Sequence, residues 1–427
     1  VLHCYLDVVW LARRAGLELP TLLLEKVEAM CRYDAYAGKP DHNEIAMGDS
    51  DEIDQRDMIT RGAMLFESPL LKSRGYEIPD FDTIWDIGEE GLRRYMALVS
   101  RLPQDTDRAF ADSGNFYFRS GWGKDATFAH FHCGPLGAGH GHADKLHLDI
   151  FSRGEDLLVD AGRYSYVFGD ERIRFKETKA HNTLLVDGLE IYPLKDSWEC
   201  HKLTRGINQK FWANEQYGYA EGAHLAYMGA DNCGVLVNRR VIYLKPDIFV
   251  IADEIYGAGR HTGNQFFHFN NRGSLSGGGD HYEYAGGKLH ADIRFVARGF
   301  SSKAVASRIS RHYNEMEENP AIETSFAVED CASAFTVVGL SDTGANVSLE
   351  VREVPVDSNF KCIRFGANQV QALDIRFGKL HYTLVLAHEE YASPTDTFRV
   401  DGCMGYGSTA IFDRAAGEAE AGTVLLW

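Results

Sequence analysis

The 427-residue sequence is poor in three features that mark common classes of protein. It has no run of about 18–20 apolar residues, the length that a membrane-spanning helix needs, and no secretory signal. Its 62 acidic residues outnumber 44 lysines and arginines, and a net charge of −18 disfavours nucleic acid and anionic membranes as partners. Its eight cysteines form no CxxC pair, so we expect free, buried thiols rather than a disulfide scaffold.

The first part of the chain has the apolar spacing of helices. Leu2, Leu6 and Val9 share one face at helical spacing. Helices are expected over residues 1–16, 20–38, 53–66 and 82–100, each bounded by Gly, Pro or polar residues. Because the sequence opens inside a helical pattern at Val1, we expect further residues ahead of it, removed by processing or belonging to another chain.

The pattern changes near Pro103. Beyond it, short alternating runs between Gly, Asn and Asp predict strands and turns, as in NFYFRSGW, ATFAHFHCG, KLHLDIFSRG, DLLVDAG and HNTLLVDG. The clearest hairpin is VLVNRRVIYLKPDIFVIADEI, which turns at Lys245-Pro246-Asp247. We therefore predict an α+β protein, with a helical domain over residues 1–107 and a large antiparallel β domain over residues 108–427.

Histidines are concentrated in one short window, at positions His130, His132, His140, His142 and His147. Two imidazoles and one carboxylate, from His142, Asp160 and His181, form a common ligand set for zinc. They stand near predicted strand ends, where a β scaffold could bring them together. Their spacing is wider than in structural zinc sites, so hydrogen-bonded core histidines remain the alternative.

His140 and His142 form an H-x-H pair among glycines. Alternate residues of an extended strand point the same way, so His140 could stand beside a metal held by His142 and be free for chemistry. The neighbouring residues are expected to have other roles: structural for His130 and His132, loop-fixing for Asp144, and exposed or ligand-supporting for His147.

The basic run ERIRFKETK concentrates positive charge in an acidic chain. Arg172 and Arg174, with the two lysines that follow, could bind sulfates or carboxylates. The alternative is a solvated strand or loop face. Tyr164, Tyr166 and Arg119 are further candidates for substrate contact, with packing or a salt bridge as the alternative.

Several motifs follow one another in order between Asn115 and Gly188: FYFRSGWG, GHGHADKLHLDIFSRGEDLLVDAG, RYSY and RFKETKAHNTLLVDG. Together they resemble the signature region of the heparinase II/III-like polysaccharide lyases. The helical N-terminal part, including AMGDSDEIDQRDMITRGAMLF, is similar to the last helices of that family's toroid. The resemblance implies a partial (α/α) toroid followed by an antiparallel β-sandwich. It also implies β-elimination on a uronic-acid polysaccharide such as heparin, heparan sulfate or alginate.

The resemblance also implies roles for single residues. The family's metal ligands, which hold zinc in some members, match His142, Asp160 and His181, and its catalytic histidine from the β domain matches His140. A catalytic tyrosine and an asparagine or histidine belong to the toroid, and we expect them ahead of Val1. The implied partners are an acidic polysaccharide and the N-terminal remainder of the toroid. Export is implied too, whereas unpaired cysteines suit a reducing compartment, so periplasm, exterior and cytoplasm stay open.

β-Elimination removes the proton at C5 of a uronate and expels the oxygen at C4. The neighbouring carboxylate must be neutralised, a base must take the proton, and an acid must serve the leaving oxygen. We expect His140 to be the base or the partner of that carboxylate, and the metal to fix its loop. Two other hypotheses use the same residues: a cupin-like metal oxygenase, and a carbohydrate-binding protein without catalysis.

Overall fold

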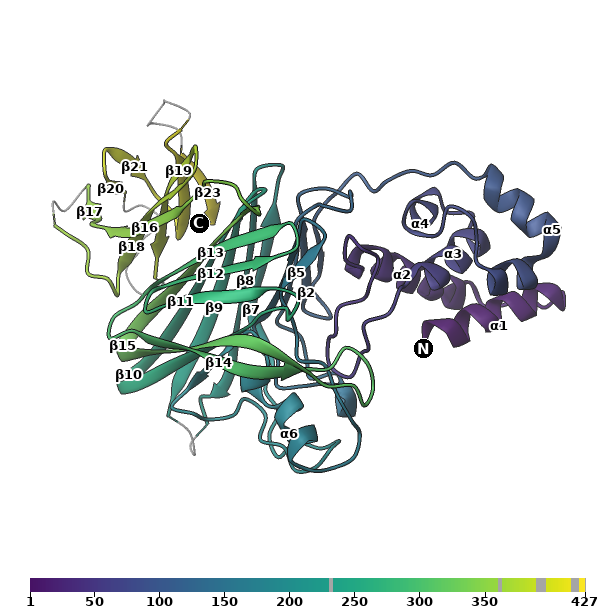
Figure 1. The fold of residues 1–427 in the computed structure, drawn as a ribbon, viewed down its shortest axis with the longest axis horizontal. Helices are drawn as coiled ribbons and strands as arrows, with labels where there is room; N and C mark the ends of the chain where they lie inside the picture. The colour runs from purple at the N-terminus through teal and green to yellow at the C-terminus, as the bar shows by residue number, and fades with distance from the viewer. Residues whose placement is uncertain (230–232, 360–362, 389–396, 416–421, 427) are drawn as a thin grey trace.

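The structure is a computed structural model that describes residues 1–229, 233–359, 363–388, 397–415 and 422–426. Most of the helices gather at one end of the molecule, and stacked sheets make up most of the rest (Figure 1). Helix α5 ends at Ala97 and strand β1 begins at Arg108. No helix among the described residues is long and apolar enough to cross a membrane, and no disulfide joins the described cysteines.

The helical part contains α1 (Leu2–Arg14), α2 (Thr21–Ala37), α3 (Arg56–Leu65), α4 (Pro69–Arg74) and α5 (Phe81–Ala97). The apolar face of α1 packs against α2 and α3 in one core that includes Leu6, Val27 and Ile59. Helix α4 was not expected, because its six residues are too few to show periodicity. The toroid implied by the resemblance stays a prediction.

The strands form three main antiparallel sheets. The first contains β1 (Arg108–Phe110), β2 (Asn115–Arg119), β3 (Phe128–His132), β4 (His147–Ser152) and β5 (Glu155–Leu158) in chain order. The central sheet has ten strands in the order β11 (Ser274–Gly278), β12 (His281–Gly286), β13 (Leu289–Val296), β15 (Glu317–Asp342), β10 (Ile248–His268), β9 (Val235–Leu244), β8 (Tyr217–Tyr227) and β7 (Gly206–Ala213), with β14 (Ser301–Ile309) on β15 and β6 (Leu184–Val186) on β10.

The third sheet contains β16 (Leu349–Val354), β18 (Val370–Phe377), β19 (Leu380–Ala387), β22 (Thr409–Asp413) and β23 (Gly422–Leu426), beside a small sheet of β17 (Asp357–Ser358), β20 (Phe398–Val400) and β21 (Cys403–Gly405). The predicted hairpin is present: Leu244 of β9 pairs with Ile248 of β10. The large antiparallel sheets expected from the sequence are therefore confirmed.

The central sheet is apolar on both faces. Val241 of β9 belongs to one core together with Phe118 of the first sheet, and the adjacent Ile242 belongs to a second core with Leu373 of the third sheet. Successive side chains of a strand point to opposite faces, so the ten-stranded sheet is a middle layer (Figure 1). The β part thus has a third layer beyond the two of the expected sandwich.

The segment between α2 and α3 fastens the helical part to the sheets. The buried Lys39 ammonium lies 2.9 Å from Glu52 of the same segment and 2.9 Å from Asp156 of β5. Glu52 also contacts the Arg311 guanidinium at 3.2 Å, in the loop after β14. These ion pairs are shielded from water and hold this segment across the face where the histidine-bearing loops emerge.

Candidate active site and metal centre

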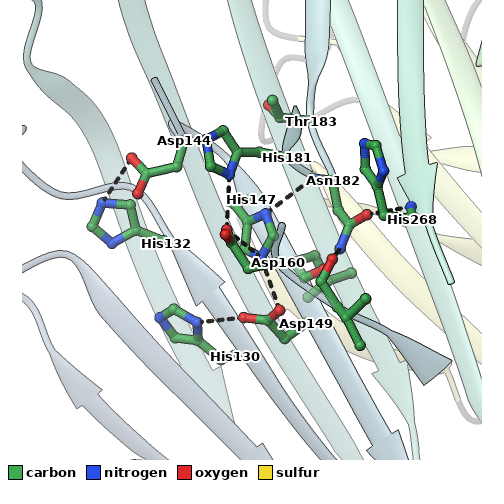
Figure 2. Close-up of polar contacts among 12 residues, drawn as sticks. His130, His132, Asp144, His147, Asp149, Asp160, His181, Asn182, Thr183 and His268 are labelled. Atoms are coloured by element: carbon green, nitrogen blue, oxygen red, sulfur yellow. Dashed lines mark hydrogen bonds and ion pairs between the residues drawn. The ribbon is translucent and has the colours of Figure 1, made fainter. Parts of the chain in front are cut away.

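His142, Asp160 and His181 come together inside the β part. His142 follows the short helix η1 (Ala138–His140), Asp160 follows β5, and His181 follows η2 (Thr178–Ala180). All three are buried, and one ligand atom from each lies within 4.8 Å of the others. Figure 2 shows Nδ1 of His181 bonded to Asp160 Oδ2, at 2.8 Å.

Two nitrogens of this cluster fit a metal. His142 uses Nε2 for a 3.0 Å hydrogen bond to Asp49, and His181 uses Nδ1 for Asp160. The other nitrogens, Nδ1 of His142 and Nε2 of His181, are buried without a hydrogen-bond partner among the described residues. A buried polar atom without a partner is costly, and coordination of a divalent ion such as zinc would satisfy both.

A second set of residues surrounds Asp160 (Figure 2). His147 Nε2 lies 2.9 Å from Asp149 and 3.6 Å from Asp160, and its Nδ1 accepts the backbone N–H of Asn182 at 2.9 Å. The alternative of an exposed His147 is wrong, because both faces of β4 are buried. Its contacts are those of a residue that orients a ligand.

His130 and His132 lie in the same buried layer but belong to the scaffold. Both contact Oδ1 of Asn115, at 3.0 and 2.7 Å, and His130 also contacts Asp149. The carboxylate of Asp144 lies 3.7 Å from His132. These contacts tie β2, β3 and β4 together beneath the loops of the site.

His140 stands at the surface, with 66% of its side chain exposed. Its Nδ1 lies 2.9 Å from Oδ2 of Asp49, and its Nε2 has no hydrogen-bond partner among the residues described. The expected shared strand face with His142 is wrong, because the segment turns in a short 3₁₀ helix and His142 points inward. Both imidazoles nevertheless contact the carboxylate of Asp49, His140 from the exposed side and His142 from the buried side.

Asp49 is the carboxylate that organises the site, and the sequence did not single it out. The buried Arg172 guanidinium contacts both of its oxygens, and its backbone N–H donates to the His140 carbonyl at 3.1 Å. Burial alone would raise the pKa of Asp49, but the bonds from His142 and Arg172 outweigh it and hold that pKa well below its usual range. These contacts therefore favour the ionised form of the Asp49 carboxylate.

Gly48 shows how closely the Asp49 segment approaches. Its φ of +59° is in the left-handed region, and a Cβ there would lie 2.8 Å from the His140 carbonyl oxygen. Only glycine meets both demands. In the sequence, Gly48 and Asp49 are marked only by their place in the polar loop GDSDEIDQRD, within the longer run that resembles the family's toroid.

The basic run is helix α6 (Asp170–Lys176), not a strand or loop face. Arg172 and Lys176, four residues apart, point inward and are buried. Lys176 donates to the carbonyls of Gly139 and Ser197 at 2.8 and 3.1 Å. Arg172 is engaged by Asp49 and has no surface for a substrate anion, which corrects its expected role. Arg174 lies on the other side of α6, in the wall of a separate cavity of about 540 Å³.

Arg119 is also corrected. It is fully buried, its guanidinium donates to the carbonyls of Tyr36 and Gly38, and it lies against the ring of Phe128. It joins α2 to the first sheet, so the salt-bridge or packing alternative describes it better than substrate contact.

The two tyrosines of RYSY have different surroundings. Tyr164 stacks on Phe175 of α6 at 5.8 Å between centroids, which is a packing role. Tyr166 lies 5.8 Å from the His140 ring. Trp198, which the sequence did not single out, lies 5.4 Å from the same ring. His140 is therefore flanked by aromatic side chains at the surface.

The site thus consists of a buried His–Asp–His cluster and an exposed histidine above it. Layered antiparallel sheets carry this site, next to a helical part. A family model described as Heparinase II/III-like, C-terminal, matches residues 103–338. The chain belongs to this family.

Relatives and solved structures agree with that assignment. A heparin-sulfate lyase of Pedobacter heparinus is 24% identical over 265 residues, which cover 60% of this chain and 35% of that protein. One of Bacteroides stercoris is 24% identical over 250 residues, covering 56% and 32%. A heparinase III structure has a TM-score of 0.71 at 17% identity, covering 90% of this chain and 56% of its own. The heparan sulfate lyase HepC of Pedobacter heparinus gives 0.70 at 16% identity, covering 92% and 59%. The chain thus spans about a third of the curated relatives and just over half of the solved structures.

Proposed function

We propose that this chain carries the β-domain half of the active site of a polysaccharide lyase that cleaves a glycosaminoglycan by β-elimination. One observation carries the proposal: His140 stands exposed, its Nδ1 is held by the Asp49 carboxylate, and its Nε2 has no hydrogen-bond partner among the described residues. The relatives named heparin-sulfate lyases support this substrate class, and alginate remains a further candidate.

The pairing of His140 with Asp49 suits a general base. A carboxylate that accepts the Nδ1 hydrogen fixes the tautomer in which Nε2 bears the lone pair. That nitrogen can take the C5 proton of a uronate, and Asp49 stabilises the imidazolium that forms. The acid that protonates the leaving oxygen is proposed to be a tyrosine of the toroid, as the resemblance to the family implies.

The metal is assigned a structural role in this reaction. Held by His142, Asp160 and His181, a divalent ion would supply a fixed positive charge beneath the loop that carries His140. His142 bonds to Asp49 on the opposite side of its ring, so its placement also sets the place of Asp49. The ligands are buried, which disfavours the open coordination position that a cupin-like oxygenase needs.

The experiment adds heparin, heparan sulfate, hyaluronan, chondroitin sulfate and alginate to the complete enzyme, with both halves of the active site, and records the ultraviolet absorbance of the new double bond. His140→Ala should abolish product formation on the polysaccharide that reacts. His281→Ala is the matched control, because His281 of β12 is a half-buried histidine that pairs with Asp292 of the neighbouring strand β13. If no polysaccharide gives an unsaturated product, the lyase proposal fails, and carbohydrate binding without catalysis becomes the better explanation.

A further inference from the structure

Three aromatic side chains from distant segments meet beside His140. Tyr166 follows β5, Trp198 lies in the loop before β7, and Tyr313 lies in the loop between β14 and β15. Tyr166 stacks on Trp198 at 5.2 Å between centroids and lies 5.5 Å from Tyr313. Trp198 and Tyr313 remain 46% and 41% exposed, so the rings do not form a core.

We propose that Trp198 and Tyr313, joined by Tyr166, form a stacking platform for one pyranose ring of the substrate, next to the sugar from which His140 takes its proton. The occupant rests on the proposed function, which supplies the class of sugar. Pyranose rings present C–H groups on their faces, and amphipathic aromatic rings beside polar groups suit such faces. The rings of Trp198 and His140 contact each other with their centroids 5.4 Å apart and an angle of 84° between their planes. This contact places the platform next to the proposed base.

The loop that carries Trp198 is held in place before any sugar arrives. Asp196 accepts the backbone N–H groups of Trp198 and Glu199 at 2.7 and 2.9 Å. The carbonyl of Ser197 accepts from the buried Lys176. A Cβ at position 139 would lie 3.3 Å from the indole, so Gly139 lets the indole lie closely on the His140 loop. A platform that is already ordered loses little conformational freedom on binding.

The arginines beneath the rings are already neutralised. Arg163 lies 4.8 and 4.9 Å from the centroids of Tyr166 and Tyr313, but its guanidinium is paired with Asp51 at 2.9 and 2.7 Å. Arg172, 5.7 Å from the Trp198 ring, is paired with Asp49. The platform therefore contacts ring faces rather than anionic groups, and its contribution to binding should not depend on ionic strength.

The test measures binding apart from cleavage. In the His140→Gln protein, which lacks the proposed base but keeps a side chain of similar size against Trp198, calorimetry follows size-defined oligosaccharides of heparan sulfate and hyaluronan. Adding Trp198→Ala should weaken binding about tenfold, as loss of a well-covered aromatic face implies, and Trp198→Phe should stay within about threefold. The factor should be the same at low and at high ionic strength.

Trp85→Ala is the matched control, because Trp85 is an exposed tryptophan stacked on Phe81 of α5 and makes no contact with the site. Binding unchanged by Trp198→Ala, a loss that high salt removes, or no binding by the parent protein would each overturn the platform. If Trp198-dependent binding is found but no polysaccharide yields an unsaturated product, the lyase proposal fails and the platform stands. If product forms and the KM of Trp198→Ala equals that of the wild type, the platform fails and the lyase stands.

Discussion

Asp49→Asn tests whether one carboxylate organises the site. The substitution keeps the shape of the side chain but removes its charge and replaces one acceptor by an amide donor. His140, His142 and Arg172 all contact this carboxylate. An asparagine can accept at one oxygen only, so at least one of these groups loses its acceptor.

The loss in stability follows from Arg172. Its side chain is fully buried, and that of Asp49 is 3% exposed, so the variant leaves a buried guanidinium without its counter-ion. Breaking such a pair costs about 3–5 kcal/mol of unfolding free energy. His140 also loses the partner that fixes its tautomer and position, which should lower kcat by about a hundredfold or more.

Urea unfolding and the rate of unsaturated product formation measure the two effects separately. Asp54→Asn is the control from the same loop, because Asp54 also pairs with an arginine, Arg56, but both side chains are about one-third exposed. An exposed pair of this kind contributes at most about 1 kcal/mol. If Asp49→Asn proves as stable as Asp54→Asn, the carboxylate does not hold the site together.

Three further predictions concern other parts of the molecule. A chelator should lower the melting temperature of the wild type, and His181→Ala should remove both the bound metal, measured by elemental analysis, and that chelator-dependent shift. Burial would raise the pKa of Glu254, but Arg240 and His388 outweigh it and lower that pKa to about 2. Stability from this carboxylate is therefore complete above an ordinary pKa near 4.5 and lost as pH falls toward 2, by about 3 kcal/mol in total. Urea unfolding across that range should show the loss in wild type and not in Glu254→Gln. Arg119→Met should lower the unfolding free energy by about 2–4 kcal/mol and leave KM within about twofold, whereas a rise in KM alone would restore the substrate role.

The sequence predicted those elements that local pattern determines. Helical spacing located α1, α2, α3 and α5, and alternation with turn residues located β2–β6 and the β9–β10 hairpin. It failed where length or context decides: α4 has six residues, and α6 has its charged residues Arg172 and Lys176 on its buried side. Charged side chains are rarely buried unless paired, so the basic run predicted either a site for substrate anions or a solvated face.

Only the site residues that belong to recognisable motifs could be predicted from the sequence. His142, Asp160 and His181 were expected to meet because a resemblance grouped them, and the structure brings them together. Asp49 lies in the quoted run AMGDSDEIDQRDMITRGAMLF, but the sequence assigned it no chemistry, and Trp198 lies in a loop without a motif. Long-range packing brings both residues to His140. No spacing rule relates position 49 to positions 140 and 172, which are more than ninety residues away.

The contacts of the loop after α2 imply that the active site and the junction between the helical part and the sheets depend on each other. Asp49 and Asp51 pair with Arg172 and Arg163 of the β part, and Glu52 pairs with Arg311. Three acidic residues within four positions are thus neutralised across the junction. Among the described residues, Asp49 of the same loop is also the hydrogen-bond partner of the His140 imidazole. A displacement of the helical part relative to the sheets would therefore move Asp49, release His140 from its anion and reorient the rings above Arg163. The position of the helical part and the placement of the proposed base are therefore linked through this loop.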